Sequence, residues 1–262
     1  MRIATASLHG APGVTTTGLA LALILGETLG STLLVEADQA GGSLAAELGV
    51  PASPGLVELA AVGAHRVLAE VLPPQLRRLS ATVDALLAPP SSRPTVAALD
   101  VLAEPLAAML ATAPNVVVDV GRLAADSRVE PLLDAMDVLL VLTRATTADL
   151  AALFGRLDQL SEHGCALTVA VSEQGPHAAD ATHALAEVVD LLAGRAVVVG
   201  VLPFDPGGVR RLTSGAPPRR TGLHLAVTAI LHRLQALMPV SVEQPVNMLL
   251  DEPRAALVGG ES

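Results

Sequence analysis

A short loop near the N-terminus carries the residues best suited to bind an anion. It reads His9-Gly10-Ala11-Pro12-Gly13-Val14-Thr15-Thr16-Thr17 and lies between the apolar run Ile3–Ser7 and a helical pattern. A glycine-containing turn between a strand and a helix gathers backbone N–H groups around one point, which suits a phosphate. The threonine hydroxyls could cap the helix or contact a metal ion and a phosphate. The simpler alternative is an ordinary capped helix start.

Composition limits the chemistry available at this loop. The 262 residues include no lysine, so all 16 basic residues are arginines. A coding bias explains most of this absence. Whatever its cause, the absence of lysine excludes Schiff-base chemistry, a lysine general base and a phosphate-binding lysine within this chain. The single Cys165 excludes an intrachain disulfide framework, and the scattered histidines show no metal-type pairing. A net charge of −10 argues against a broad nucleic-acid-binding surface.

The elements that must position the loop form a regular series. Short apolar runs alternate with Ala/Leu-rich helical patterns, which predicts a parallel sheet covered by helices on both faces. We therefore expect a three-layer α/β fold with about seven or eight mostly parallel strands. Residues 1–238 are expected to form a single domain, and residues 239–262 a flexible C-terminal tail. The predicted strands are Ile3–Ser7, Thr32–Val35, Val83–Leu87, Asn115–Val120, Val138–Thr143, Ala166–Ser172 and Ala196–Leu202. The predicted helices lie near Gly18–Thr28, Leu56–Glu70, Thr95–Thr112, Thr147–His163, Ala178–Leu192 and Leu223–Met238.

The loop resembles the deviant Walker A loop of the MinD/ParA superfamily, whose pattern is Lys-Gly-Gly-x-Gly-Lys-Thr-Thr. The matching positions are Gly10, Gly13, Thr15 and Thr16. His9 stands at the family's signature lysine, Ala11 replaces a glycine, and Val14 replaces the phosphate-binding lysine. Coding bias would most simply replace a lysine by arginine, so a valine at this position suggests that the function itself was lost.

Three further segments support the resemblance in the family's order. Asp38 matches the residue that positions the attacking water, while Glu36 replaces the first aspartate of that motif. Val116–Asp119 resembles the Walker B strand, whose carboxylate holds the Mg²⁺ shell through water. Val199–Asp205 and the segment Gly215-Ala216-Pro217 resemble the parts that flank the nucleotide base. The stretch from Gly41 to Leu59 is loosely similar to the TadZ/CpaE-like pilus-positioning branch.

The resemblance implies a specific set of site residues. Asp38 would be the catalytic residue, and Thr15 and Asp119 would serve Mg²⁺. Any ATP would lie against the following residues: Gly10, Ala11, Gly13, Val14, Thr15, Thr16, Pro203 and Asp205.

Several departures weaken the expected chemistry. Removing one preorganised donor from a transition state commonly costs about 3 kcal/mol, and both loop lysines are absent. Glu173 stands where the family places an asparagine that reads adenine. We therefore expect no required cofactor and only weak binding of ATP and Mg²⁺. An internal arginine such as Arg122 or Arg144 could fill the cleft instead.

The sequence thus predicts a pseudo-ATPase that serves as a scaffold or localisation factor in a larger assembly. One alternative is a slow ATP-dependent dimerisation switch that uses a cation other than lysine. Another is a biosynthetic enzyme of the same fold group. The resemblance also implies a homodimer, or a heterodimer with an active relative, together with a protein partner from the assembly.

Surface charges bear on the remaining partners. The pairs Arg210-Arg211 and Arg219-Arg220 favour a solvated or partner-facing surface over DNA binding, given the acidic chain. The segment after residue 238 has no basic amphipathic pattern, so we expect no MinD-like membrane anchor. The chain is predicted to be cytoplasmic and to reach a pole, septum or membrane complex through a partner.

Overall fold

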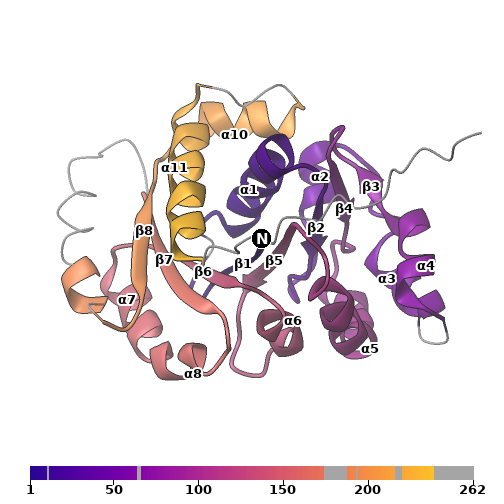
Figure 1. The fold of residues 1–262 in the computed structure, drawn as a ribbon, viewed down its shortest axis with the longest axis horizontal. Helices are drawn as coiled ribbons and strands as arrows, with labels where there is room; N and C mark the ends of the chain where they lie inside the picture. The colour runs from indigo at the N-terminus through magenta and orange to yellow at the C-terminus, as the bar shows by residue number, and fades with distance from the viewer. Residues whose placement is uncertain (11, 64–65, 174–187, 193, 216–219, 239–262) are drawn as a thin grey trace, which may run out of the picture.

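An eight-stranded sheet forms the centre of the molecule, with the strand order β3-β4-β2-β5-β1-β6-β7-β8 (Figure 1). The computed structural model describes the chain except residues 11, 64–65, 174–187, 193, 216–219 and 239–262. Neighbouring strands are parallel except β3 and β4, which pair antiparallel. The predicted α/β fold is thereby confirmed. The strands are β1 (Arg2–Ser7), β2 (Thr32–Glu36), β3 (Arg77–Arg78), β4 (Val83–Leu86), β5 (Val116–Arg122), β6 (Val138–Thr143), β7 (Ala166–Ser172) and β8 (Val197–Leu202).

Helices cover both faces of this sheet and make two hydrophobic clusters (Figure 1). One face is packed by α1 (Val14–Leu29), α2 (Leu44–Leu48), α10 (Pro206–Thr213) and α11 (Gly222–Leu237). The other face is packed by α3 (Leu56–Gly63), α4 (Leu68–Val71), α5 (Ser92–Leu110), α6 (Glu130–Asp134), α7 (Thr147–Phe154) and α8 (Leu157–Ser161), with the 3₁₀ turn η1 (Pro73–Gln75) beside them. The central strand β6 is buried along its whole length because it is covered from both sides.

The helices differ from the sequence pattern in three places. The helix expected over Thr147–His163 is divided into α7 and α8 at Gly155, because glycine is a poor helix former. The helix expected over Leu56–Glu70 is similarly divided into α3 and α4. Helix α1 begins four residues before the expected Gly18, since the left-handed Gly13 lets the chain enter the helix at Val14. Most of the helix predicted for Ala178–Leu192, and the predicted flexible tail, lie outside the described residues.

The parallel arrangement gathers the functional segments at one edge of the sheet. Strand β1 pairs with β5 on one side and with β6 on the other. The carboxyl ends of all these parallel strands lie at the same edge of the sheet. In open α/β sheets, ligands bind at this edge, at the switch point where successive connections run to opposite sides of the starting strand. The loop that follows β1 therefore lies where a ligand site is expected.

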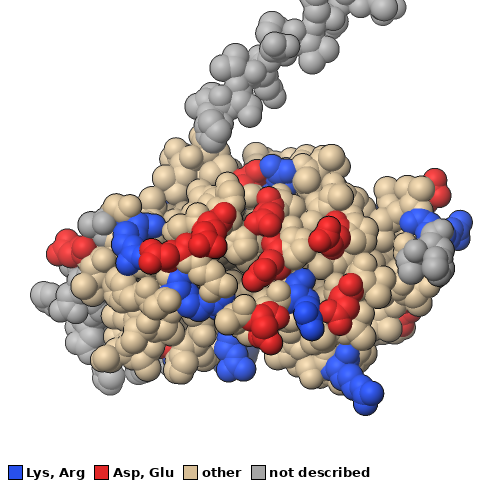
Figure 2. Space-filling view, turned by 90° about the horizontal axis from the view of Figure 1, so that it is seen from below, with Lys and Arg blue, Asp and Glu red and all other residues tan. Residues whose placement is uncertain are grey.

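Acidic and basic side chains are interspersed on the face of the molecule that Figure 2 shows. The exposed carboxylates of helices α5, α6 and α8 are Asp100, Glu104, Glu130, Asp134 and Asp158. Arg128 pairs with Asp100 and Arg195 pairs with Asp158, so two of these carboxylates are balanced by arginines. In the part of the chain that the structure describes, no helix is both long and apolar enough to cross a membrane.

Candidate functional site

The loop after β1 adopts a backbone that only glycine takes up readily. Gly10 and Gly13 have φ angles of 65° and 88°, in the left-handed region that an L side chain rarely occupies. Gly13 is also the N-cap residue of α1, and no side chain caps this helix. The N–H groups of its first turn are consequently available to a ligand. Ala11, the middle residue of the predicted site, lies outside the described residues.

Val14 stands at the position that the phosphate-binding lysine has in the Walker A pattern, but its side chain packs into the hydrophobic core. Its side chain is only 6% exposed and belongs to the hydrophobic cluster on the α1 face of the sheet. An apolar side chain in such a cluster adds packing energy and no charge. The loop therefore receives no cation from the first residue of α1.

An arginine from a neighbouring strand lies against the loop instead. Arg144 follows the end of β6, and its guanidinium packs directly on Gly10, where any Cβ would overlap it. Asp149 holds this arginine: its carboxylate accepts from Arg144 Nε at 2.6 Å and from Nη2 at 3.0 Å. His9 Nδ1 lies 2.7 Å from the same carboxylate. Arg144, one of the two arginines that the sequence nominated, therefore contacts the loop.

Asp149 is the hub of this group, which we call the Asp149 cluster (Asp149, Arg144, His9 and Thr146). The Asp149 side chain is 2% exposed, and Thr146 Oγ1 donates to it at 2.7 Å. Burial favours the neutral carboxyl, but the donors from Arg144, Thr146 and His9 outweigh it and lower the pKa of Asp149 to about 2. The carboxylate is thus ionised throughout the physiological range.

Asp119 lies in β5 beneath the start of α1 and is completely buried. Its Oδ1 accepts from the Gly121 N–H at 3.0 Å, while Oδ2 has no hydrogen-bond partner among the described residues. Burial raises the pKa of Asp119 to about 7, although the Thr15 hydroxyl and the Gly121 N–H oppose the rise. An unsatisfied carboxylate oxygen facing a threonine fits the requirements of a Mg²⁺ site.

Asp38 lies close to Asp119 but on the solvent side. Its carboxyl packs on the backbone of Gly121, where it would overlap any Cβ, and Gly121 has a left-handed φ of 63°. Oδ1 of Asp38 accepts from the Ala40 N–H at 2.8 Å. Partial burial raises the pKa of Asp38, against the effect of the Ala40 N–H and of Arg122. The predicted catalytic residue is therefore near the predicted metal residue.

Glu36, which replaces the first aspartate of the family motif, serves the architecture. It is 1% exposed and accepts three backbone N–H groups, from Ser43 at 2.7 Å, from Leu44 at 2.9 Å and from Ala88 at 2.9 Å. Burial nevertheless raises its pKa. These contacts join the end of β2 to the start of α2 and the end of β4, so both oxygens are occupied by backbone donors.

A second part of the site lies at the ends of β7 and β8. A cavity of about 420 Å³ runs from the loop, at Gly13 and Thr16, to Pro203 and Glu173. Oε2 of Glu173 accepts from the N–H of Phe204 at 3.3 Å, and Glu173 lines this cavity. Thr15 and Thr16 are half-buried at the loop end of the same region.

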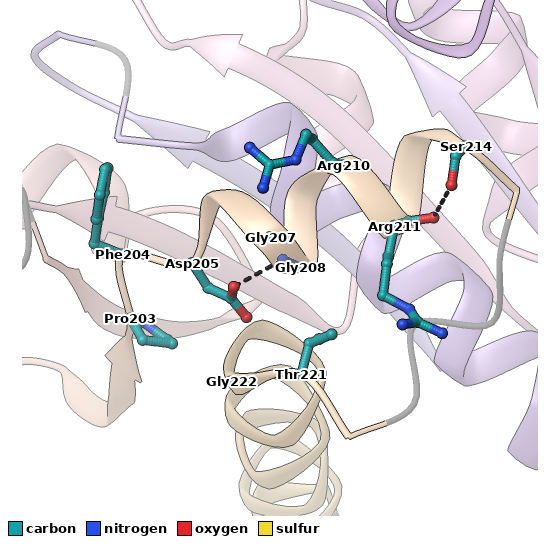
Figure 3. Close-up of a pocket in the computed structure, with 10 residues that line it drawn as sticks. All are labelled: Pro203, Phe204, Asp205, Gly207, Gly208, Arg210, Arg211, Ser214, Thr221 and Gly222. Atoms are coloured by element: carbon teal, nitrogen blue, oxygen red, sulfur yellow. Dashed lines mark hydrogen bonds between the residues drawn. The ribbon is translucent and has the colours of Figure 1, made fainter.

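Asp205 lines this cavity as well, and its carboxylate lies at the starts of two helices (Figure 3). Its carboxylate accepts from the Gly208 N–H at 2.7 Å and from the Leu223 N–H at 2.9 Å. These backbone donors lower the pKa of Asp205. The residue predicted to flank a base therefore caps α10 and ties it to α11.

An open pocket of about 830 Å³ surrounds these helix starts. Arg210 and Arg211 line it, but they leave α10 in different directions and do not converge on one point (Figure 3). Residues 216–219, which include most of the predicted Gly-x-Pro loop and Arg219, lie outside the described part of the chain. The predicted basic surface is thus described only at Arg210, Arg211 and Arg220.

Sequence reasoning missed Asp149. It stands three residues after Thr146, and this Thr-x-x-Asp spacing reads as an ordinary helix start, in which Thr146 caps α7 by accepting from the Asp149 N–H at 3.2 Å. The signal for a second role was the arginine five residues earlier, because a buried carboxylate requires a partner.

Comparison with known proteins finds similarity in structure. The sequence matches no protein-family model and no curated protein sequence. The structure is similar to a ParA family ATPase from Chlorobium tepidum (TM-score 0.71, 15% identity, covering 88% of this chain and 98% of that one). It is also similar to the septum site-determining protein MinD from Pyrococcus horikoshii complexed with Mg-ADP (TM-score 0.67, 18% identity, 90% and 96% covered).

A third similar structure is the MinC:MinD cell division protein complex of Aquifex aeolicus (TM-score 0.65, 15% identity, 91% and 97% covered). All three likenesses extend over nearly the whole of both chains. At these identities the likeness establishes architecture. The chain has the fold of the ParA and MinD ATPases.

Proposed function

We propose that this chain is a MinD/ParA-like pseudo-ATPase that acts as a scaffold or localisation factor in a larger cellular assembly. The observation that carries the proposal is the burial of Val14 in the hydrophobic cluster at the position of the phosphate-binding lysine. A triphosphate at the loop would lack the cation that offsets its charge in binding and in the transition state.

The remaining residues support only part of a nucleotide site. Thr15 and the unsatisfied Oδ2 of Asp119 would fit the coordination shell of a Mg²⁺ ion. The phosphates fit less well, because the Arg144 guanidinium that contacts the loop is already paired with Asp149. The carboxylate of Glu173 adds negative charge near the base position. We therefore propose that ATP and Mg²⁺ are not required for the role of this chain.

Partners follow from the same proposal. A chain that keeps the family's fold without its charge chemistry would retain a constitutive homodimer, or would pair with an active relative. It would reach a pole, septum or membrane complex by binding another protein. The net charge of −10 supports a protein partner over DNA.

The test combines two measurements on the full chain. Calorimetry with ATP and Mg²⁺ should give no binding tighter than about 10 μM, and light scattering should give the same mass with and without ATP. ATP turnover comparable to that of an ordinary ParA or MinD protein, abolished by Asp38→Ala, would refute the proposal. Asp38→Ala is the matched control because its carboxyl lies on the Gly121 backbone without supporting another helix.

A second candidate function is a slow ATP-dependent dimerisation switch that uses Arg144 as its cation. The contact between the Arg144 guanidinium and Gly10 favours it. Under this alternative ATP would increase the measured mass, and Arg144→Gln would abolish that increase. An unchanged mass in both proteins favours the scaffold.

A further inference from the structure

The Asp149 cluster joins two segments that are far apart in the sequence. His9 and Gly10 belong to the loop after β1, whereas Arg144, Thr146 and Asp149 belong to the corner between β6 and α7. The contacts across this junction are the His9 Nδ1–Asp149 pair at 2.7 Å and the packing of the guanidinium on Gly10. Strand pairing brings the two segments side by side, since Ser7 at the end of β1 pairs with Leu142 in β6.

Helix capping explains only part of the arrangement. A threonine cap on α7 needs the Asp149 backbone N–H, and Thr146 already accepts from it. It does not require the Asp149 carboxylate to be 2% exposed, to take two donors from Arg144, or to contact His9. Burying a carboxylate costs free energy unless it is paired, so the donors from Arg144 and His9 offset the cost of burying Asp149.

The charges of the cluster also matter for the loop. Asp149 takes the Nε and Nη2 donors of Arg144, so the arginine brings no net charge to Gly10. The carboxylate is the negative charge nearest to this arginine, at 2.6 Å. A phosphate-type anion approaching the uncapped start of α1 would therefore meet a neutral pair.

We propose that Asp149 is a positioning residue that holds Arg144 against the loop and binds His9 of the loop, in place of a bound anion, and that it thereby keeps the affinity of the loop for phosphate-type anions low. The inference extends the proposed function, because it states how a loop without lysines keeps its shape. It concerns binding and loop order, and makes no statement about hydrolysis.

The first experiment removes the charge and keeps the shape. Asp149→Asn is nearly isosteric and leaves Arg144 with a net positive charge beside Gly10. Calorimetry with Mg²⁺-free inorganic pyrophosphate should then show binding at least about tenfold tighter than in the wild type, as expected for about 1.4 kcal/mol. The double variant Arg144→Gln with Asp149→Asn should lose that gain. This double variant is the matched control, because it keeps the net charge of the wild-type pair.

A second experiment does not depend on the folding of the Asp149 variant. Arg144→Gln changes a partly exposed side chain, and hydrogen exchange is measured without any anion. The amides of His9, Gly10 and Gly13 should exchange at least about tenfold faster than in the wild type, while those of β7 keep their rates. Unchanged exchange at the loop would overturn the role of the cluster in holding it.

Two further results would contradict the inference. Asp149→Asn that folds but binds pyrophosphate no better than the wild type would show that Asp149 does not limit the site. A double variant, Arg144→Gln with Asp149→Asn, that binds pyrophosphate tenfold more weakly than the wild type would show that Arg144 already binds the anion. Neither result bears on ATP turnover, so failure of this inference and failure of the proposed function are distinguishable.

Discussion

Asp119 beside the loop and Asp205 between α10 and α11 are both predicted site carboxylates, and the fold treats them in opposite ways. Asp119 is fully buried, one of its oxygens has no partner among the described residues, and its pKa is raised to about 7. Asp205 accepts two well-placed backbone N–H groups, and its pKa is lowered. Asp119 therefore has an oxygen that accepts no hydrogen bond from the described residues, whereas both oxygens of Asp205 accept hydrogen bonds from the backbone.

The same difference is seen in the helix starts. Helix α10 is capped by Asp205 and α11 by Thr221, whereas no side chain caps α1 at Gly13. Backbone N–H groups that the chain satisfies itself are not available to a ligand. Within the described residues, the loop end therefore leaves the start of α1 uncapped and one oxygen of Asp119 without a partner, whereas at the α10–α11 end the chain satisfies its own polar groups. Three predictions test this contrast.

The largest expected effect is on pH dependence. The unfolded carboxyl of Asp119 titrates near 3.8 and the folded one at about 7, so the folded state holds an extra proton between these values. The free energy of unfolding should then fall as the pH rises from about 5 to 7, by up to about 1.4 kcal/mol per unit. The raised pKa values of Glu36 and Asp38 act in the same direction. Denaturant unfolding at a series of pH values measures the slope.

Asp119→Asn is the control for this slope. It removes the titrating group and should flatten the dependence in that window. Asp205→Asn should leave the slope in place, because a lowered pKa affects stability only in acid, where the carboxylate becomes protonated. An equal slope in the wild type and in Asp119→Asn would show that the buried carboxyl is not the source.

A smaller effect is expected from the α10–α11 end. Asp205→Ala removes the acceptor for the N–H groups of Gly208 and Leu223 and should lower the free energy of unfolding by about 2 kcal/mol. Asp205→Asn keeps one acceptor oxygen and should lose about half as much. Urea unfolding measures both. A loss in pyrophosphate binding with unchanged stability would instead assign Asp205 to a ligand site.

The smallest effect separates two glycines of the loop. Gly13→Ala meets no neighbouring atom and should cost about 1 kcal/mol for its left-handed backbone alone. Gly10→Ala has the same backbone cost and also displaces the Arg144 guanidinium, so its loss should be larger. Thermal unfolding measures the loss of stability in both variants. In an Arg144→Ala background the two losses should be equal. A persistent difference would mean that Arg144 does not press on Gly10.

Strongly apolar strands were the most predictable part of the fold. Val138–Thr143 and Ala166–Ser172 begin and end at the predicted residues, because strands buried on both faces have continuous apolar runs. Strand β3 was missed, since Arg77–Arg78 at the sheet edge has neither length nor apolar character. Helix α10 was missed as well, because its first turn is Pro206-Gly207-Gly208 and depends on the Asp205 cap.

The site was less predictable than the fold. The loop and Asp38 follow strands β1 and β2, and Asp119 lies in β5, so the structure brings these predicted residues to one edge of the sheet, while their roles stay predictions. The packing of Val14 into the core and the hydrogen bond from the Ala88 N–H to Glu36 depend on neighbours distant in sequence, which no local pattern contains. The Asp149 cluster was hidden for the same reason, since His9 and Asp149 are 140 residues apart.

The position of β1 in the sheet affects how the chain is made. This first strand, Arg2–Ser7, pairs only with β5 and β6, whose residues lie more than a hundred positions later. During synthesis the loop after β1 can therefore reach its final structure only after residues up to Thr143 have been added. The Asp149 cluster can form only after Asp149 has been added as well. A nascent chain released before that point would leave an apolar strand with unpaired edges, a feature that promotes aggregation. Truncation from the C-terminal side past Val138 should consequently abolish the loop as well as the strands that are removed.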